Sequence, residues 1–198
     1  MKKFIALMVL YISFLISHPV LSMIEERVDV PSHVKTQSVH SIRYMDGTLE
    51  FRSPQTAAEW NSYHTIRIAE IQERYCQGKK YNYNNPEEEI ENNFRFAFVD
   101  SSTIPSKVVG TIRVDLLEDE EAALRWVTID GKLQKQGLGT RMLVLAETFI
   151  RDRGRTLIRV PAEEYSRAFY ERLEYIPMDW PNGPHHAGEV SLGKWLIK

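Results

Sequence analysis

An apolar strand, a glycine-rich turn and a long amphipathic helix follow one another at residues 122–153, and this succession constrains the fold most. The strand is AALRWVTID, and the helix runs from about Gly137 to Arg153. A strand that passes directly into such a helix predicts a sheet with helices packed against it. The apolar residues of the helix recur at spacings of three and four, which puts them on one face: Leu138, Met142, Leu145, Ala146, Phe149 and Ile150.

Short apolar runs on either side of this unit predict further strands. FRFAFVD and KVVGTIRVDLL precede it, and EYIPM and GEVSLGKWLI follow near the end of the sequence. Helices are expected before and after the unit, over about 54–75 and over 162–173. This mixture predicts an α/β (mixed α+β) fold, with a central, mostly antiparallel sheet and helices on both faces.

The first of these helices has clear start signals. Ser53 is expected to be its N-cap, and Pro54 its first residue. Just before it, Asp46-Gly47 separates two short β-type runs and predicts a hairpin turn. The buried face of the helix is expected to carry residues three and four apart, namely Ala57, Trp60, His64, Ile68 and Ile71.

The N-terminal residues have the pattern of a targeting segment. Lys2 and Lys3 precede an uncharged, mostly apolar run, as in a secretory signal peptide. We therefore predict that 1–22 is a signal peptide or a membrane anchor, 23–44 a linker with an extra strand, and 45–198 a single domain. The protein would then be exported or anchored, with membrane contact only through 1–22. The alternative is a cytoplasmic protein whose translation starts at Met23 or Met45.

The composition excludes several kinds of protein. A formal net charge of −2 offers no broad basic face, so no nucleic-acid partner is expected. The single cysteine, Cys76, excludes an intrachain disulfide and a cysteine-based metal cluster. His185 and His186 have no third ligand at a suitable spacing, so no metal is expected. Composition does not define the oligomeric state.

The turn between strand and helix has the features of a phosphate site. Gly137 and Gly139 remove side chains where a ligand must approach the backbone closely. The first amides of a helix lack internal partners and lie at its positive dipole end, which favours phosphate binding. The residues that follow Gly139 fit neither a Walker loop nor a dinucleotide fingerprint. From the glycines alone, a turn that merely joins strand to helix remains an equal alternative.

The spacing Gln134-x-x-Gly137-x-Gly139 resembles the Gln/Arg-x-x-Gly-x-Gly/Ala signature of the GNAT family of N-acetyltransferases. SRAFYERLEYIP further resembles the end of a helix in that family, with Tyr170 at its tyrosine and Glu174 in place of its glycine. The resemblance covers about 48–198. It implies a GNAT-like sheet and an enzyme that transfers an acetyl group from acetyl-CoA to the amine of a small molecule or peptide, without a metal.

The resemblance also implies roles for individual residues. The main chain of Val127, Thr128 and Ile129 would lie along the pantetheine arm, with one amide facing the oxyanion. Tyr170 would be the general acid toward the leaving sulfur, although a packing role is its alternative. The pyrophosphate would be held by the turn residues Gln134, Lys135, Gln136, Gly137, Leu138, Gly139 and Thr140.

The acceptor site is less defined by the sequence. Arg113 and Asp115 share one face of their strand, and Arg125 lies on the next strand. They are acceptor-site candidates, for example for an amine that carries a carboxylate, and cross-strand ion pairs are the alternative. Glu163 stands where the family often has asparagine, and would serve the acceptor or cap a helix. An exported, catalytically inactive binding protein of the same fold is the competing function.

Overall fold

The structure is a computed structural model, and it describes residues 42–72, 81–180 and 188–196. The strands are β1 (Arg43–Asp46), β2 (Leu49–Arg52), β3 (Asn93–Asp100), β4 (Lys107–Leu116), β5 (Glu121–Ile129), β6 (Leu157–Glu163), β7 (Ile176–Pro177) and β8 (Glu189–Trp195). The helices are α1 (Ala57–Arg67), α3 (Leu138–Asp152) and α4 (Arg167–Glu171), with shorter helical turns η1 (Ile68–Gln72), η2 (Pro86–Glu89), η3 (Gly131–Leu133) and η4 (Glu164–Ser166).

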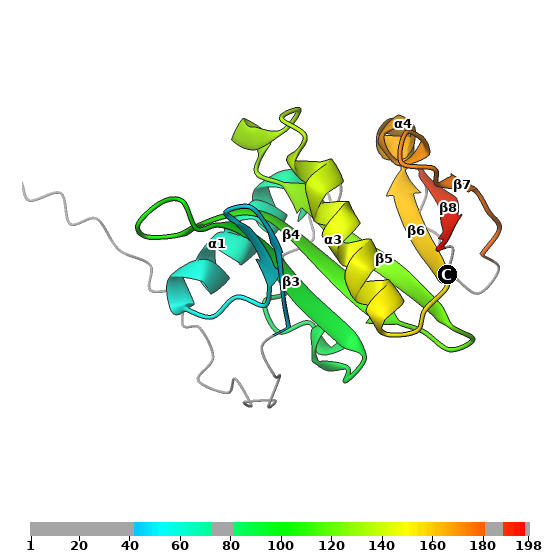
Figure 1. Cartoon of the computed structure of the whole chain (residues 1–198), viewed down its shortest axis with the longest axis horizontal. Coiled ribbons are helices and arrows are strands. Elements are labelled where there is room, and N and C mark those ends of the chain that lie inside the picture. Colours follow the sequence, from blue (N-terminus) through cyan, green and yellow to red (C-terminus); the bar gives the residue numbers. More distant parts are fainter. Residues whose placement is uncertain (1–41, 73–80, 181–187, 197–198) are drawn as a thin grey trace, which may run out of the picture. The chain divides into compact units, whose positions relative to one another are not determined.

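The strands form one eight-stranded sheet in the order β1-β2-β3-β4-β5-β6-β8-β7 (Figure 1). Strands β5 and β6 are parallel, and the other neighbours in the described sheet are antiparallel. Because parallel neighbours need a long crossover, α3 connects β5 to β6. The predicted mixed α/β fold with a mostly antiparallel sheet is confirmed.

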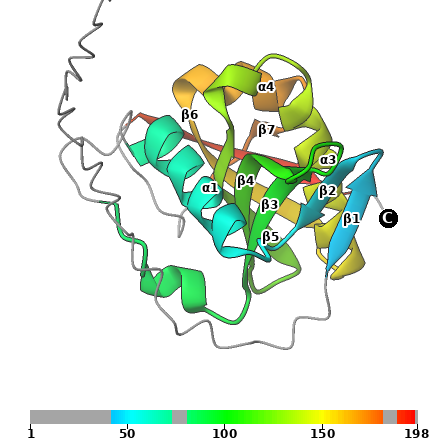
Figure 2. The same ribbon diagram turned by 90° about the vertical axis from the view of Figure 1, so that its left-hand side faces the viewer.

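Helices α1 and α3 lie on opposite faces of the sheet (Figure 2). Side chains alternate between the two faces of a sheet along a strand, so β3 contributes side chains to the core on the α3 face and to the core on the α1 face. Phe96 and Phe98 belong to the core cluster that contains the apolar stripe of α3, whereas Ala97 and Val99 pack with Tyr63 of α1. The predicted stripe of α3 is confirmed for its inner members, since Met142, Leu145, Ala146, Phe149 and Ile150 are buried.

The predicted start and buried face of α1 are wrong. Thr56 is the N-cap, and its side chain accepts a hydrogen bond from the Glu59 amide at 3.1 Å. The buried residues of the helix are Glu59, Tyr63, Ile66 and Arg67. The apolar pattern missed this face because two of its members are charged side chains that are buried through ion pairs.

Two further predictions about chain segments have different outcomes. The hairpin at Asp46-Gly47 is confirmed, with Gly47 at φ +62°. The helix expected over 162–173 is wrong in its first part, because β6 pairs with β8 as far as Glu163. Its helical part is divided between η4 and the five residues of α4.

The predicted targeting segment and most of the predicted linker lie outside the described residues, as do Cys76, His185 and His186. The domain boundaries and the cellular location therefore stay predictions. In the part of the chain that the structure describes, no helix is both long and apolar enough to cross a membrane.

Candidate functional site

A β-bulge interrupts β5 in the middle of the sheet. Thr128 pairs with Thr111 of β4, and Arg125 pairs with Arg113, so Trp126 and Val127 together face a single residue of β4. Trp126 has φ +54°, which is uncommon for a residue with a side chain. A bulge bends the strand locally and redirects its backbone groups, and such bulges occur often beside active sites.

β5 and β6 separate before the chain reaches the bulge. Their parallel pairing covers only Glu121–Ala123 and Leu157–Arg159. β6 continues to pair with β8 on its other side as far as Glu163, so it diverges from β5 toward α4 (Figure 1). The predicted residues Val127, Thr128 and Ile129 lie in this separated half of β5. Their main chain can therefore bind an extended ligand without breaking the described sheet.

The glycine turn, residues 134–140, leads from β5 into α3. Gly137 is the N-cap, with φ +80° and no side-chain capping bond. The first backbone bond within the helix runs from the Arg141 amide to the Gly137 carbonyl, at 3.2 Å. The amides of Leu138, Gly139 and Thr140 consequently have no acceptor among the described residues, at the positive end of a 15-residue helix. This arrangement can bind an anion.

The two glycines of the turn serve different purposes. A Cβ atom at Gly137 would have no heavy atom within 4 Å, so the space over this residue is open. A Cβ atom at Gly139 would lie 3.2 Å from Cζ of Phe169, which belongs to α4. Gly137 thus allows the left-handed turn and leaves room for a ligand, whereas Gly139 lets α4 approach α3.

Glu70 of η1 holds the turn through two hydrogen bonds, and no sequence pattern pointed to this residue. Its Oε1 accepts from the Gly131 amide at 3.1 Å, and its Oε2 accepts from Nε2 of Gln134 at 3.0 Å. Gln134 also donates to the carbonyl of Ile129 at 3.0 Å. The side chain of Gln134 therefore positions the turn. The side chains of Lys135 and Gln136 are exposed.

Tyr170 of α4 is 5% exposed and packs against Phe169 and Tyr175, with ring centres 5.2 and 5.4 Å away. Its hydroxyl makes no hydrogen bond with the described residues. Burial raises the pKa of Tyr170 well above its ordinary value, which keeps the hydroxyl protonated at neutral pH. The group is therefore a proton donor that lacks an acceptor. The packing role expected as its alternative is also observed.

The structure brings the acceptor-site candidates of β4 and β5 together. Arg113 donates to both carboxylate oxygens of Asp115, from Nε at 2.7 Å and from Nη2 at 2.9 Å. Arg125 donates to the same carboxylate at 3.3 Å. Burial raises the pKa of Asp115, against the opposing effect of Arg113. The cross-strand ion pair expected as one alternative is therefore present between Arg125 and Asp115, beside the pair of Arg113 and Asp115 within β4.

Two residues that the sequence did not single out extend this group. Glu88 of η2 accepts from Arg113 at 3.1 Å and from Arg67 of α1 at 3.0 Å. We refer to Arg67, Glu88, Arg113, Asp115 and Arg125 as the arginine cluster. It lies on the α1 face of the sheet, and Arg67 also contacts the ring of Trp126 at the bulge, 5.4 Å from its centre.

Glu163 ends β6 opposite Glu189 of β8. Glu163 occupies the N-cap position of η4, as its helix-cap interpretation expects, but its side chain makes no capping hydrogen bond. An acceptor role for Glu163 stays a prediction.

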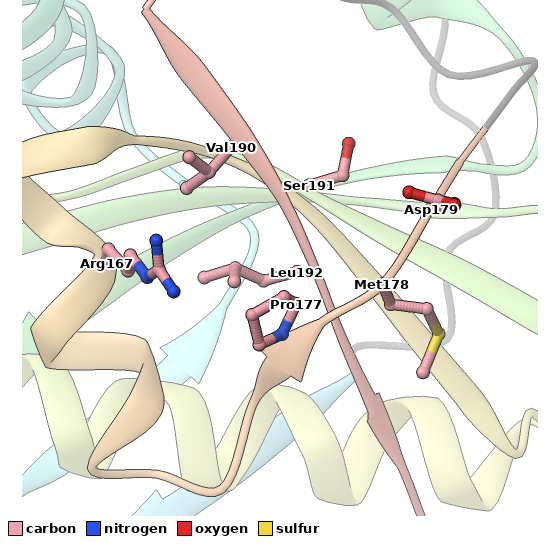
Figure 3. Close-up of a pocket in the computed structure, with 7 residues that line it drawn as sticks. All are labelled: Arg167, Pro177, Met178, Asp179, Val190, Ser191 and Leu192. Carbon is pink, nitrogen blue, oxygen red and sulfur yellow. The ribbon is translucent and has the colours of Figure 1, made fainter.

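A separate hollow of about 450 Å³ lies at the β7–β8 edge of the sheet (Figure 3). Arg167 of α4 extends toward Leu192 of β8, and Met178, Asp179 and Ser191 line the other side. None of the predicted site residues lines it. No three His, Cys, Asp or Glu side chains are grouped to hold a metal within residues 42–72, 81–180 and 188–196.

Comparisons with known proteins agree with this geometry. Residues 57–175 match the profile of the acetyltransferase (GNAT) family. Among curated protein sequences there is no match. Many solved structures share the fold. One is an acetyltransferase of the GNAT family from Staphylococcus aureus, with 12% identity and a TM-score of 0.60 over 75% of this chain and 99% of that one.

Two similar structures contain coenzyme A. An aminoglycoside 6'-N-acetyltransferase complexed with coenzyme A has 16% identity and a TM-score of 0.60, over 75% of this chain and 97% of that one. The PaiA N-acetyltransferase of Thermoplasma acidophilum, in complex with coenzyme A, has 13% identity and a TM-score of 0.55, over 77% of this chain and all of that one. At these identities the likeness shows the fold alone.

Proposed function

Since the chain belongs to the acetyltransferase (GNAT) family, whose profile matches residues 57–175, we propose that it transfers an acetyl group from acetyl-CoA to an amine acceptor. One observation carries the proposal: the bulged, separated half of β5 leads directly to unpaired amides at the start of α3. A ligand with an extended arm and a phosphate end would meet both features at once.

The glycine turn fits the phosphate end of acetyl-CoA. Three amides that have no acceptor among the described residues lie there, the space over Gly137 is open, and the exposed Lys135 adds positive charge at the rim. We infer that Leu138, Gly139 and Thr140 donate to the pyrophosphate through their amides. Gln134 contributes by holding the turn in place with Glu70.

The separated half of β5 would hold the arm and the reacting end. The main chain of Val127, Thr128 and Ile129 would donate and accept hydrogen bonds along the pantetheine arm. An amide at the bulge would face the carbonyl oxygen, where negative charge develops during acyl transfer. Acetyl-CoA supplies the acetyl group as a thioester.

Tyr170 would protonate the departing thiolate. Its hydroxyl is protonated at neutral pH and has no competing acceptor among the described residues. A general acid must lie within hydrogen-bond reach of the group that it protonates, and this position is inferred from its place in the family motif. The amine would attack directly in a ternary complex, with no acetylated side chain as an intermediate.

The proposal is tested by incubating the full chain with acetyl-CoA and a panel of primary amines, and measuring free thiol and acetylated amine. We expect both products in equal amounts, and no acetyl group on the protein by intact mass when the amine is omitted. Acetyl-CoA binding without turnover across the panel would favour the inactive binding protein. An acetylated protein would contradict direct attack.

A further inference from the structure

We propose that the amine acceptor carries a carboxylate, and that Arg67 and Tyr63 bind this carboxylate beside the bulge of β5. The inference rests on the proposed function, because it names the class of acceptor for the same site. It is carried by hydrogen-bond donors of Arg67, in the arginine cluster, and of the neighbouring Tyr63, which are buried without a partner among the described residues.

Arg67 is 2% exposed, yet among the described residues only one of its three nitrogen atoms has an acceptor. Nη1 donates to Glu88, whereas Nε and Nη2 are buried with no hydrogen-bond partner in the described part of the chain. The hydroxyl of Tyr63, a residue with no exposed surface, likewise has no partner there. Buried polar groups in folded proteins are nearly always paired, so three such atoms on neighbouring side chains indicate a place for a missing ligand or water.

The two unpaired atoms of Arg67 form the edge of a guanidinium that binds carboxylates in a bidentate manner. The same cluster contains an example, because Arg113 presents Nε and Nη2 to the two oxygens of Asp115. In Arg67 this edge is buried and has no acceptor among the described residues. A carboxylate therefore matches it better than a neutral group with a single acceptor atom.

The charges of the arginine cluster also favour a ligand that carries a single negative charge. Three guanidinium groups, those of Arg67, Arg113 and Arg125, meet two buried carboxylates, those of Glu88 and Asp115. Glu87 reaches Arg113 from a side chain that is 63% exposed, where water screens its charge. One added carboxylate would balance the buried charges. A doubly charged phosphate would be repelled more strongly by Glu88.

The position of Arg67 connects this site to the proposed reaction. Its guanidinium carbon lies 4.2 Å from the ring centre of Tyr63 and 5.4 Å from that of Trp126. Trp126 is the residue whose positive φ makes the bulge, next to the main chain that would face the acetyl group. A carboxylate held by Arg67 would thus place the rest of a small amine near the bulge.

The test is a titration of the full chain, followed by tryptophan fluorescence, with glycine, β-alanine, L-alanine and L-phenylalanine, each beside its primary amide. The amide keeps the size and the amine but lacks the negative charge. We expect at least one amino acid to bind about tenfold tighter than its amide, and to be acetylated with a kcat/KM about 100-fold higher.

Variants identify the residues responsible. Arg67→Gln should abolish the preference for the carboxylate. Tyr63→Phe should weaken carboxylate binding several-fold while the protein stays folded, because the deleted hydroxyl has no partner in the described residues. Arg153→Gln is the matched control, since this arginine also stacks on aromatic rings but on Phe94 and Phe149, in the other core cluster.

The outcomes separate this inference from the proposed function. Equal binding of every acid and amide, or a preference that survives in Arg67→Gln and Tyr63→Phe, would overturn the carboxylate site and leave water as the partner of these atoms. Acetylation of amines without any carboxylate preference would contradict this inference alone. Binding of amino acids by a chain that does not bind acetyl-CoA would contradict the proposed function alone.

Discussion

The two ends of α3 provide a matched pair of substitutions that separates stability from ligand binding. Gly137 at the start of the helix has φ +80°, and Gly154 just past its end has φ +72°. Neither has a heavy atom within 4 Å of the place where a Cβ atom would be added. Alanine at either position would therefore be strained by the backbone conformation and not by a steric clash.

The expected loss of stability in each variant follows from that strain. A left-handed conformation costs an ordinary residue about 1–2 kcal/mol. For a protein of this length, each kcal/mol lowers the Tm by about 2–4 °C, so Gly137→Ala and Gly154→Ala should each lower it by roughly 2–8 °C. Urea unfolding should give the same loss of free energy for both variants. Gly137→Asn should lose less, because asparagine tolerates this conformation.

Binding of acetyl-CoA should distinguish the two variants. Gly137→Ala would relieve its strain by moving the amides of the glycine turn, and losing one amide–phosphate hydrogen bond weakens binding about tenfold or more. Gly154→Ala lies at the far end of the helix and should leave the Kd unchanged in calorimetric titration. Equal Kd values for both variants would show that the amides at Gly137 do not bind the ligand, and a Gly137→Ala protein as stable as the parent would show that this position is not strained.

Four other substitutions test separate parts of the account. Tyr170→Phe should lower kcat about 100-fold with little change in the Kd for acetyl-CoA, and unchanged turnover would remove this hydroxyl from the mechanism. Arg113→Met should lower the free energy of unfolding in urea by about 3–5 kcal/mol, because it removes the guanidinium shared by the buried carboxylates of Glu88 and Asp115 and leaves each with one arginine partner; a loss below about 1 kcal/mol would contradict the buried ion pairs. Hydrogen bonds from Arg52 lower the pKa of Glu59 from 4.5 to about 2, so this pair stabilises the protein above pH 4.5 and loses its effect as the pH falls through about 2. The stability difference between parent and Glu59→Gln, followed by urea unfolding, should therefore shrink from pH 5 to pH 2, and a constant difference would argue against the pair. Glu174→Gly should raise the Tm by about 2–4 °C, since Glu174 has φ +68° where glycine is unstrained, and a lower Tm would show that its side chain makes a stabilising contact.

Features encoded within a few neighbouring residues could be predicted from the sequence. The apolar spacing of 138–150 predicted α3 because one face of that helix packs on the sheet. The glycine turn was predicted because its glycines and the helix start lie within seven residues of one another. Asp46-Gly47 predicted its hairpin because the turn needs only local backbone freedom.

Features that depend on distant partners could not be predicted. Arg67 and Glu88 are 21 positions apart, and Glu70 and Gly131 are 61 positions apart, so no local pattern joins them. A charged residue such as Arg67 is expected to be exposed unless its partner is known. The bulge at Trp126 also has no local signal, since no glycine marks it.

Glu174 shows how a departure from a family pattern can be interpreted physically. The sequence has glutamate where the family usually has glycine, and the structure keeps the left-handed conformation there. The helix end therefore adopts a left-handed conformation at Glu174 at the expense of local strain. Nothing in this change affects the glycine turn or the bulge.

The central claim is that the glycine turn binds the phosphates of acetyl-CoA. It is tested most directly by calorimetric titration of acetyl-CoA into the full chain, beside a Gly137→Asp variant that places a negative charge at the turn. We expect micromolar binding by the parent and its loss in the variant. A folded parent that does not bind acetyl-CoA, or a variant that binds it equally well, would show that the glycine turn does not hold the phosphates.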